Sequence, residues 1–476
     1  MKRIENKQRM VRKWVWVVLP FYLFTFLPFV TYAQKPTPNP QPSTINLQSS
    51  TFNIYTPSSG GDGRAIVLCP GGGYNHLAGE KEGAEWVPFF NEQGIAVVVT
   101  KYTLPAGDRN KPLNDIRETF RFLHEHASEY GINPNGIGIM GFSAGGHLAS
   151  AYANSEWGEL RPAFEILLYP VIRLDNKEHL GMAKKFLGDN VTDDERKAWS
   201  TNRMVTMETP KTIIITADDD PTIDPTNSSI YYEALKRNHV QASLHIYPSG
   251  GHGFGFKKSF PYHEEMKKNL TDWLKTIQVA NANAMKVACI GNSITYGARL
   301  KYRDTESWPA QLQVMLGKDY NVRNYGNSGA TMTNGDRGYM KEPPYKYAKI
   351  FAPDLVFIKL GTNDVQPLRW QGEEAFTEAY QQMVDELKAL PSHPKIVLWL
   401  PATSYREEKH VDAEIAGKTF PLIQKIAKKN KLDVIDLHTP TANHPELFPD
   451  KLHPNAEGEK IIAETIFQYM KKNIRK

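Results

Sequence analysis

Short apolar runs alternate with amphipathic helical patterns along most of the chain, and this alternation restricts the fold more than any other feature. Between two of the runs, Leu113, Ile116, Phe120 and Leu123 recur at spacings of three and four residues, which is typical of one face of a helix. The runs that indicate buried strands in the first part of the chain are residues 64–69, 95–100, 136–140, 166–170, 213–216 and 244–247. Strands that alternate with helices predict an α/β fold with a doubly wound, mostly parallel sheet.

The same alternation begins again at Met285, after a segment of small residues at 279–284 that predicts a linker. The apolar runs of this second part are residues 286–290, 355–360, 395–400 and 432–435. A chain of 476 residues calls for two or three domains of roughly 100–200 residues each. We therefore predict an α/β domain over 46–278 and a second, smaller α/β domain over 285–476.

The positive charge of the chain lies at its N-terminal end. The sequence has 57 Lys and Arg residues against 52 Asp and Glu residues, a formal net charge of +5. Residues 1–13 hold six basic residues and one acidic residue, so the remaining chain is balanced. A balanced chain gives no support for binding to nucleic acid or to a membrane surface.

The basic head is followed by an uncharged apolar run at 14–30 and by small residues before Gln34, which is the pattern of a secretory signal peptide. An uncleaved membrane anchor is the alternative, but 17 residues that include two prolines are short for a span of about 20. We therefore expect a signal peptide over 1–33 and a Pro-rich tether over 34–45. The protein is then periplasmic or secreted, with no stable membrane partner after cleavage.

A first candidate catalytic motif, Gly141-Phe-Ser143-Ala-Gly145, follows the strand at 136–140 and opens a helix of small residues. This is a G-x-S-x-G pattern in a strand–turn–helix context, where a tight turn holds the serine hydroxyl above the sheet. We predict Ser143 as a nucleophile. The N–H of Ala144, at the helix N-terminus, is expected to donate to a developing oxyanion.

Two more segments stand at strand ends in the places that an α/β-hydrolase requires. The Gly-rich loop 70–73 follows the strand at 64–69, and its Gly72 and Gly73 are the expected second part of the oxyanion hole. The acid is expected in the Asp-rich segment after the strand at 213–216. Asp220 is preferred because it precedes a proline, and Asp219 is the second choice.

The expected base is His252, which lies between glycines after the last strand of the first domain. The order Ser, Asp, His along the chain is that of α/β-hydrolases. His76 and His147 also lie near these motifs and are expected to be packing or substrate-contact residues. Each segment alone fits an ordinary turn or solvated loop. The prediction of a catalytic triad depends on the occurrence of all the segments at strand ends in the required order.

Four polar blocks are spaced over the second domain. They are Gly291-Asn-Ser-Ile-Thr after its first strand, Asn324-Tyr-Gly-Asn-Ser-Gly, Gly361-Thr-Asn-Asp, and Asp450-Lys-Leu-His-Pro. Asp450 and His453 are three residues apart, so one turn can deliver both side chains to one site. The four blocks in this order resemble the SGNH (GDSL-type) hydrolases over nearly all of 285–476.

The SGNH resemblance implies a flavodoxin-like three-layer α/β/α domain with a serine site. It makes Ser293 the nucleophile, His453 its base and Asp450 the residue that orients the imidazole. The N–H groups of Ser293 and Gly326 and the side-chain amide of Asn363 would form the oxyanion hole. The sequence departs from the commonest family form at Asn292, where that form has Asp.

Residues 60–275 resemble the acetyl-xylan-esterase-like branch of the α/β-hydrolases. The stretches PGGGYNHLAGEKEG, GFSAGGHLAS, LLYPVI and LHIYPSGGHGFGF carry the likeness. It implies an α/β-hydrolase sheet and the deacylation of carbohydrate esters. We therefore expect an exported two-domain serine esterase that hydrolyses O-acetyl esters of polysaccharides such as acetylated xylan, with feruloyl esters as a further candidate.

Other interpretations stay open at this level. The second domain also resembles bacterial sialate O-acetylesterases, which would make a host glycan the substrate. One domain could instead be a carbohydrate-binding module on an inactive hydrolase fold, although both halves carry a complete serine, acid and histidine set. A secreted lipase is third, and the sequence offers no obvious long apolar lid.

No cofactor and no metal are expected, because no cluster of His or Cys residues has the spacing of metal ligands. Cys69 and Cys289 lie in separate apolar runs, so we expect two buried free thiols rather than a disulfide. The expected partner is the acetylated polysaccharide itself, and no nucleic acid.

Overall fold

The computed structural model describes residues 45–46, 51–58, 60–366, 368–407 and 411–474, which all belong to one compact unit. The predicted signal peptide and the predicted tether up to residue 44 lie outside the described residues. Within these ranges, no helix has both the length and the apolar character needed to cross a membrane.

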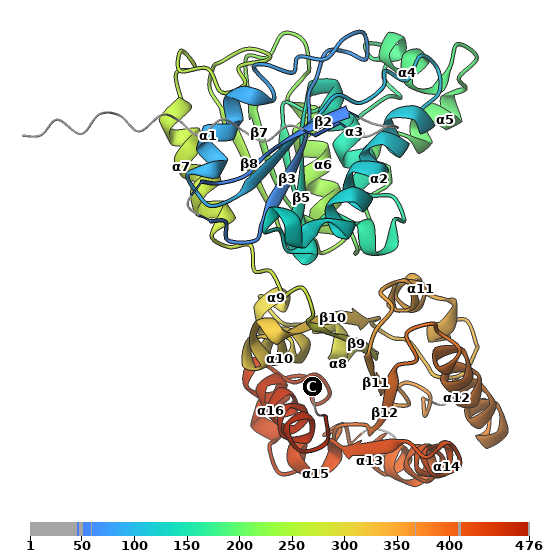
Figure 1. Cartoon of the computed structure of the whole chain (residues 1–476). Coiled ribbons are helices and arrows are strands. Elements are labelled where there is room, and N and C mark those ends of the chain that lie inside the picture. Colours follow the sequence, from blue (N-terminus) through green and yellow to red (C-terminus); the bar gives the residue numbers. More distant parts are fainter. Residues whose placement is uncertain (1–44, 47–50, 59, 367, 408–410, 475–476) are drawn as a thin grey trace, which may run out of the picture. The chain divides into compact units, whose positions relative to one another are not determined.

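The first sheet has eight strands in the order β1-β2-β4-β3-β5-β6-β7-β8 (Figure 1). The strands are β1 (Ile45–Asn46), β2 (Thr51–Tyr55), β3 (Ala65–Cys69), β4 (Ala96–Thr100), β5 (Ile137–Phe142), β6 (Phe164–Leu168), β7 (Lys211–Ala217) and β8 (Ala242–Tyr247). Strands β3 to β8 run parallel, whereas β2 is antiparallel to both β1 and β4. The α/β class and the mostly parallel sheet are thus as predicted, and the antiparallel β1 and β2 are an addition.

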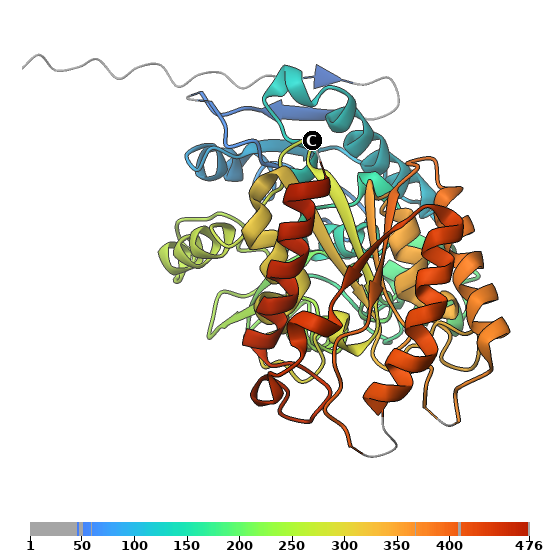
Figure 2. The ribbon, with the colours of Figure 1, turned by 90° about the horizontal axis from the view of Figure 1, so that it is seen from below.

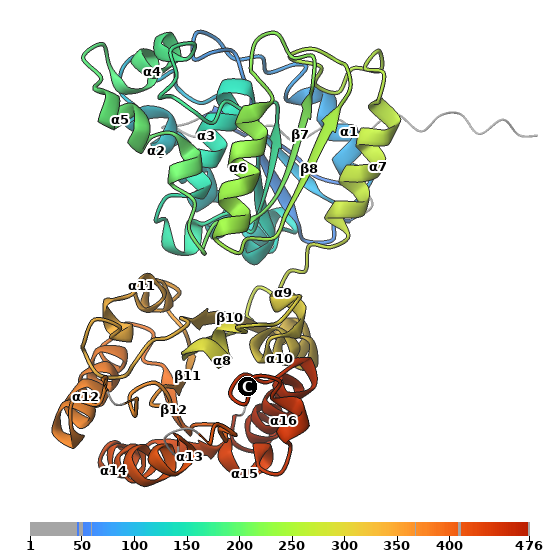
Figure 3. The ribbon, with the colours of Figure 1, turned by 180° about the vertical axis from the view of Figure 1, so that it is seen from behind.

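Helices cover both faces of this sheet (Figures 1 and 3). They are α1 (Val87–Asn91), α2 (Asn110–Glu125), α3 (Ser143–Ala153), α4 (Leu180–Leu187), α5 (Asp193–Ala198), α6 (Thr226–Arg237) and α7 (His263–Leu274). The buried faces of α2, α3 and α6 share one hydrophobic core with the sheet, and those of α1 and α7 share the other. The helix periodicity from Leu113 to Leu123 becomes the buried side of α2.

The second sheet has five parallel strands in the order β10-β9-β11-β12-β13. They are β9 (Met285–Gly291), β10 (Tyr320–Gly326), β11 (Leu355–Lys359), β12 (Lys395–Leu400) and β13 (Asp433–Asp436). Three layers of helix, sheet and helix result, which is the predicted α/β/α arrangement. Strand β10 was not predicted, because its sequence YNVRNYG is polar and forms a sheet edge.

The α-helices of this domain also divide between two faces, and Figure 2 shows α16 across the sheet from the orange helices. They are α8 (Ser293–Tyr296), α9 (Arg303–Glu306), α10 (Trp308–Leu316), α11 (Pro343–Ile350), α12 (Glu373–Lys388), α13 (Val411–Glu414), α14 (Phe420–Asn430), α15 (His438–Thr441) and α16 (Ala456–Asn473). One core includes α11, α12 and α14, and the other includes α10 and α16. Cys69 and Cys289 are buried free thiols, as predicted.

Two candidate active sites

Ser143 stands on a sharp turn between β5 and α3. Its backbone has φ +51°, a left-handed conformation that a serine adopts only where the surrounding structure enforces it. The turn needs glycine beside it, because a Cβ on Gly145 would overlap the carbonyl oxygen of Cys69 at the end of β3. The predicted G-x-S-x-G segment is therefore a strained strand-to-helix elbow that presents the hydroxyl.

The structure brings the first predicted triad together at the carboxyl ends of β5, β7 and β8. His252 Nε2 lies 2.9 Å from Ser143 Oγ, and His252 Nδ1 lies 2.7 Å from Asp220 Oδ2. The N–H groups of Thr222 and Ile223 donate to Asp220 Oδ1 at 2.8 and 2.9 Å. Asp219, the second choice for the acid, instead accepts from the Gly251 N–H at 2.8 Å.

Electrostatics keep Asp220 ionised in this site. Burial raises the pKa of the Asp220 carboxyl, but hydrogen bonds from His252 and from the N–H groups of Ile223 and Thr222 outweigh it and leave the pKa below its usual value. An ionised Asp220 holds the Nδ1 proton of His252 and leaves Nε2 to accept a proton from Ser143.

The Gly-rich loop after β3 lies against this serine. A Cβ on Gly71 would be 3.0 Å from the Cβ of Ser143, and Gly72 and Gly73 have φ values of +126° and +61°. The N–H groups of Gly72, Gly73 and Ala144 donate to none of the described residues. All three predicted oxyanion donors are therefore unengaged, and the loop that carries two of them contacts the nucleophile through Gly71.

Glu82 fixes this loop, and it was not predicted. It is 3 % exposed, its Oε2 accepts from the Gly71 N–H at 2.8 Å, and its Oε1 accepts from the Tyr169 hydroxyl at 3.0 Å. The role arises only from tertiary contacts, so no local motif points to it. His147 is buried between the Tyr74 hydroxyl and the Trp199 carbonyl, and burial lowers its pKa to about 4, so it is a packing residue.

The second predicted triad is also assembled. His453 Nε2 lies 2.8 Å from Ser293 Oγ, where α8 begins after β9, and His453 Nδ1 lies 2.8 Å from Asp450 Oδ2. The N–H groups of Leu452 and His453 donate to Asp450 Oδ1 at 3.1 and 2.7 Å. Burial raises the pKa of Asp450, but hydrogen bonds and the charge of His453 outweigh it and lower the pKa to about 2.

The oxyanion hole of this second site needs one correction. The N–H of Gly326 donates to Asn324 Oδ1 at 2.9 Å, so it is occupied within its own loop because the Asn324 side chain folds back on it. In the same loop, Gly329 has φ +83° and its N–H donates to none of the described residues. Asn363 Nδ2 donates one hydrogen to the Ala330 carbonyl at 2.9 Å, which orients the amide and leaves its other hydrogen.

A buried lysine below the nucleophile was not predicted. Lys359, at the end of β11, is 0 % exposed, and its Nζ donates to Asn292 Oδ1 at 3.0 Å. Burial lowers the pKa of Lys359 to about 7 and raises that of Glu459, which is also buried, to about 8. Asn292 Oδ1 also accepts weakly from the Ile294 N–H at 3.4 Å, while its Nδ2 has no partner among the described residues. The departure at Asn292 therefore places a neutral group against a buried cation.

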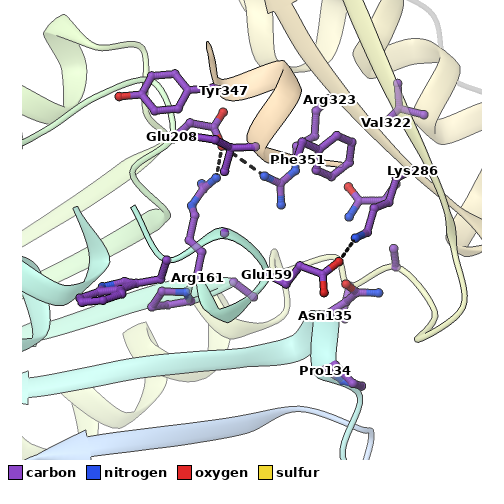
Figure 4. A pocket seen from close by; sticks show the side chains of 18 of the residues that line it. Pro134, Asn135, Glu159, Arg161, Glu208, Lys286, Val322, Arg323, Tyr347 and Phe351 are labelled. Atoms are coloured by element: carbon purple, nitrogen blue, oxygen red, sulfur yellow. Dashed lines mark hydrogen bonds and ion pairs between the residues drawn. The ribbon is translucent and has the colours of Figure 1, made fainter. Parts of the chain in front are cut away.

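A cavity of about 880 Å³ lies away from both triads (Figure 4). None of the triad residues lines it. Most of its charged side chains are already paired, since Glu208 binds both Arg161 and Arg323, and Glu159 binds Lys286. The ion pairs in this cavity indicate a structural role for its charged side chains. Both candidate active sites lie outside it.

Comparison with known proteins agrees with this geometry. Residues 289–461 match the model of the GDSL-like Lipase/Acylhydrolase family, and residues 52–165 match the BD-FAE model. An acetylxylan esterase of Xylanibacter ruminicola is 41% identical over 429 residues, which cover 85% of this chain and 89% of that protein.

Two further likenesses are partial. Endo-1,4-beta-xylanase B of Butyrivibrio fibrisolvens is 30% identical over 202 residues, which are 40% of this chain and 32% of that protein. The crystal structure of an acetyl ester-xyloside bifunctional hydrolase from Caldicellulosiruptor lactoaceticus is 32% identical, with a TM-score of 0.45, and covers 48% of this chain and 88% of its own. Because the likeness to the Xylanibacter ruminicola protein extends over nearly the full length of both, this chain belongs to the family of that acetylxylan esterase and is a carboxylic ester hydrolase.

Proposed function

We propose that this protein removes O-acetyl groups from an acetylated polysaccharide such as acetylated xylan, and that it does so at two independent serine sites. The observation that carries the proposal is the presence of two complete Ser–His–Asp arrangements, each with its serine within 3 Å of the imidazole. The acetylxylan esterase relative supports the substrate class. We further propose that the protein is exported, on the basis of the basic and apolar N-terminal segments.

In the first site, Ser143 Oγ attacks the carbonyl carbon of the acetyl ester while His252 Nε2 takes the hydroxyl proton. Asp220 holds the imidazole by Nδ1 and stabilises the imidazolium that forms. The N–H groups of Gly72, Gly73 and Ala144 bind the oxyanion of the tetrahedral intermediate. The imidazolium then protonates the sugar oxygen, which leaves an acetyl-enzyme on Ser143.

Water completes the cycle, because His252 removes a proton from it as it attacks the acetyl-enzyme, and acetate leaves. The second site follows the same course with Ser293, His453 and Asp450. There the amide of Asn363 and the N–H of Ser293 bind the oxyanion, with Gly329 N–H as the third donor in place of Gly326.

Two esterase sites on one chain are useful if they remove acetyl groups from different positions of one polymer. Binding at one site raises the effective concentration of the other site along the same polymer. The triads differ in their surroundings, since the Asp220 side chain is 0 % exposed and the Asp450 side chain is 21 % exposed. Such a difference favours different acetyl positions or different neighbouring substituents.

The test compares the wild type with Ser143→Ala, Ser293→Ala and the double variant on acetylated xylan, by acetate release and by NMR of the remaining acetyl groups. Each single variant should keep part of the activity and leave a different set of acetyl groups. The double variant should lose activity by about 10³-fold or more. Identical residual acetyl patterns would refute the division of positions, and loss of all release in one single variant would assign the other domain to binding.

A further inference from the structure

The acids of the two triads, Asp220 and Asp450, accept the same set of hydrogen bonds. Any further partner of one acid can therefore be judged by comparison with the other. In each, Oδ1 accepts two backbone N–H groups and Oδ2 accepts the histidine Nδ1. Among the described residues, no Arg or Lys pairs with Asp220. Two arginines pair with Asp450. These arginines are therefore not required to complete a triad of this kind.

Both arginines are accessible and come from separate loops. Arg299 Nε lies 2.8 Å from Asp450 Oδ2 with its side chain 70 % exposed, and Arg406 lies 3.8 Å from the same oxygen with its side chain 39 % exposed. Within the described part of the chain, Asp450 is the sole acidic partner of either. Two cations thus share one carboxylate that already holds His453, which leaves an excess positive charge at the rim of the second site.

The backbone at Arg299 adds an independent observation. It has φ +70°, a conformation that is uncommon for a residue with a long side chain, and it lies six residues after Ser293. Strain of this kind persists where the surrounding structure enforces it, and it is concentrated at functional sites. The Arg299 side chain reaches the edge of the triad, where its Nε meets Asp450 Oδ2.

A recess continues from Arg299 away from the triad. This cavity, about 530 Å³, is lined in part by Tyr296, Lys301, Tyr302 and Arg303, with one acid, Asp304. Tyr302 is 57 % exposed, and the Arg303 guanidinium stacks 4.1 Å from the centre of the Tyr296 ring. The Tyr296 ring is thus covered by a guanidinium, whereas the exposed Tyr302 ring beside Lys301 and Arg299 suits a sugar ring that carries a negative charge.

We propose that Arg299 and Arg406 bind a carboxylate of the substrate, so that the second site selects acetyl esters on glycans that bear an acidic sugar next to the acetylated one. The inference rests on the proposed function and deepens it for one of the two sites. The carboxylate has two possible sources with the same chemistry, a uronic acid on the polysaccharide and a sialic acid.

The test uses Ser143→Ala protein, so that acetate release reports the second site alone. Its substrates are a neutral acetylated xylo-oligosaccharide, the same oligosaccharide with a glucuronic acid on the neighbouring residue, the methyl ester of that uronate, and O-acetylated sialic acid. Arg299→Gln and Arg406→Gln are compared with Lys451→Gln, which removes one charge next to Asp450 from a side chain that is paired with Glu407.

Each arginine variant should lower kcat/KM on the carboxylated substrates by about ten- to hundredfold, mainly through KM, because a charge-assisted hydrogen bond is lost. At a pH above the acid limb, where His453 is neutral in all variants, activity on the neutral and methyl-esterified substrates should stay within about threefold of the parent. Lys451→Gln should leave all rates near the parent values. The faster of the uronate and sialic acid substrates identifies the source of the carboxylate.

Equal rates on neutral and carboxylated substrates would overturn this inference and leave the proposed function intact. A parallel loss on all substrates in the arginine variants would also overturn it, because the arginines would then act through Asp450. Absence of acetate release from every oligosaccharide and from sialic acid would overturn the proposed function of this site, and the inference with it.

Discussion

At the scale of single residues, the buried charge of Lys359 contributes to the pKa of the base in the second site. Burial lowers the pKa of His453, the hydrogen bond and charge of Asp450 raise it, and the charges of Lys359 and Arg406 lower it further. A base works when it is neutral, so the acid limb of kcat/KM reports this pKa. Lys359, with a pKa of about 7, is protonated throughout that limb.

Lys359→Met in the Ser143→Ala background should therefore raise the pKa of His453 and move the acid limb to higher pH. Asn292→Asp should move it in the same direction, because a carboxylate would neutralise Lys359. The measurement is kcat/KM against pH on an uncharged acetyl ester. An acid limb that does not move in either variant would show that Lys359 has no electrostatic effect on His453.

Asn363 allows a sharper test of transition-state stabilisation. Its amide is held by the Ala330 carbonyl, so the second amide hydrogen is preorganised for an oxyanion. Asn363→Ala in the Ser143→Ala background should lower kcat by about 10²–10³ and change KM little, as is found for a single oxyanion donor. Single-turnover kinetics would measure the acylation step, and an unchanged acylation rate would remove Asn363 from the oxyanion hole.

Some site residues can be predicted from the sequence and others cannot. The triad residues can be predicted one by one, because each stands in a short motif. The structure brings the three members of each triad together. The sequence does not predict the roles of three other residues, because their contacts join segments that are distant along the chain. They are Glu82, Lys359 and Arg299. Gly326 was expected as a donor, and the side chain of Asn324 occupies its N–H.

At the scale of elements, burial decides which strands can be predicted. β3 to β7 are almost wholly buried, so they appear as continuous apolar runs. The edge strand β10 is partly exposed and carries polar residues, which an apolar pattern does not detect. The same reasoning applies to β2, whose sequence alternates polar and apolar side chains and pairs antiparallel near the sheet edge.

The elbow between β5 and α3 makes a prediction at this scale. Gly145→Ala would place a methyl group against the carbonyl oxygen of Cys69, so β3 and α3 would have to separate. We expect a loss of about 1–3 kcal/mol in the free energy of unfolding and the loss of first-site activity, measured by denaturant unfolding and by acetate release in the Ser293→Ala background.

A matched control lies in α4, where a Cβ on Gly181 would meet no atom within 4 Å. Gly181→Ala should be neutral or stabilise the protein by up to about 1 kcal/mol, because alanine restricts the unfolded chain. If Gly145→Ala unfolds at the same denaturant concentration as this control, the close approach of the elbow to β3 does not limit stability.

At the scale of the whole molecule, the formal charge is divided unevenly between the N-terminal end and the rest of the chain. The formal charge of +5 resides in residues 1–13, and the rest of the chain has as many acidic as basic residues. At the rim of the second site, two arginines share one carboxylate, which leaves a local positive charge. The proposed recognition of an acidic substituent therefore depends on this local charge, because the chain after residue 13 has no net charge to attract an acidic polymer.

The proposed export makes a prediction about the composition of the mature protein. Cleavage before Gln34 would remove every residue of the excess charge, because residues 14–33 carry none. The mature protein should therefore have an isoelectric point well below the value of 8.8 for the full chain, near neutrality. Intact mass spectrometry and isoelectric focusing of protein recovered from the periplasm or the medium of a bacterial host test both points. A full-length mass with a basic isoelectric point in a membrane fraction would instead assign residues 14–30 to an anchor.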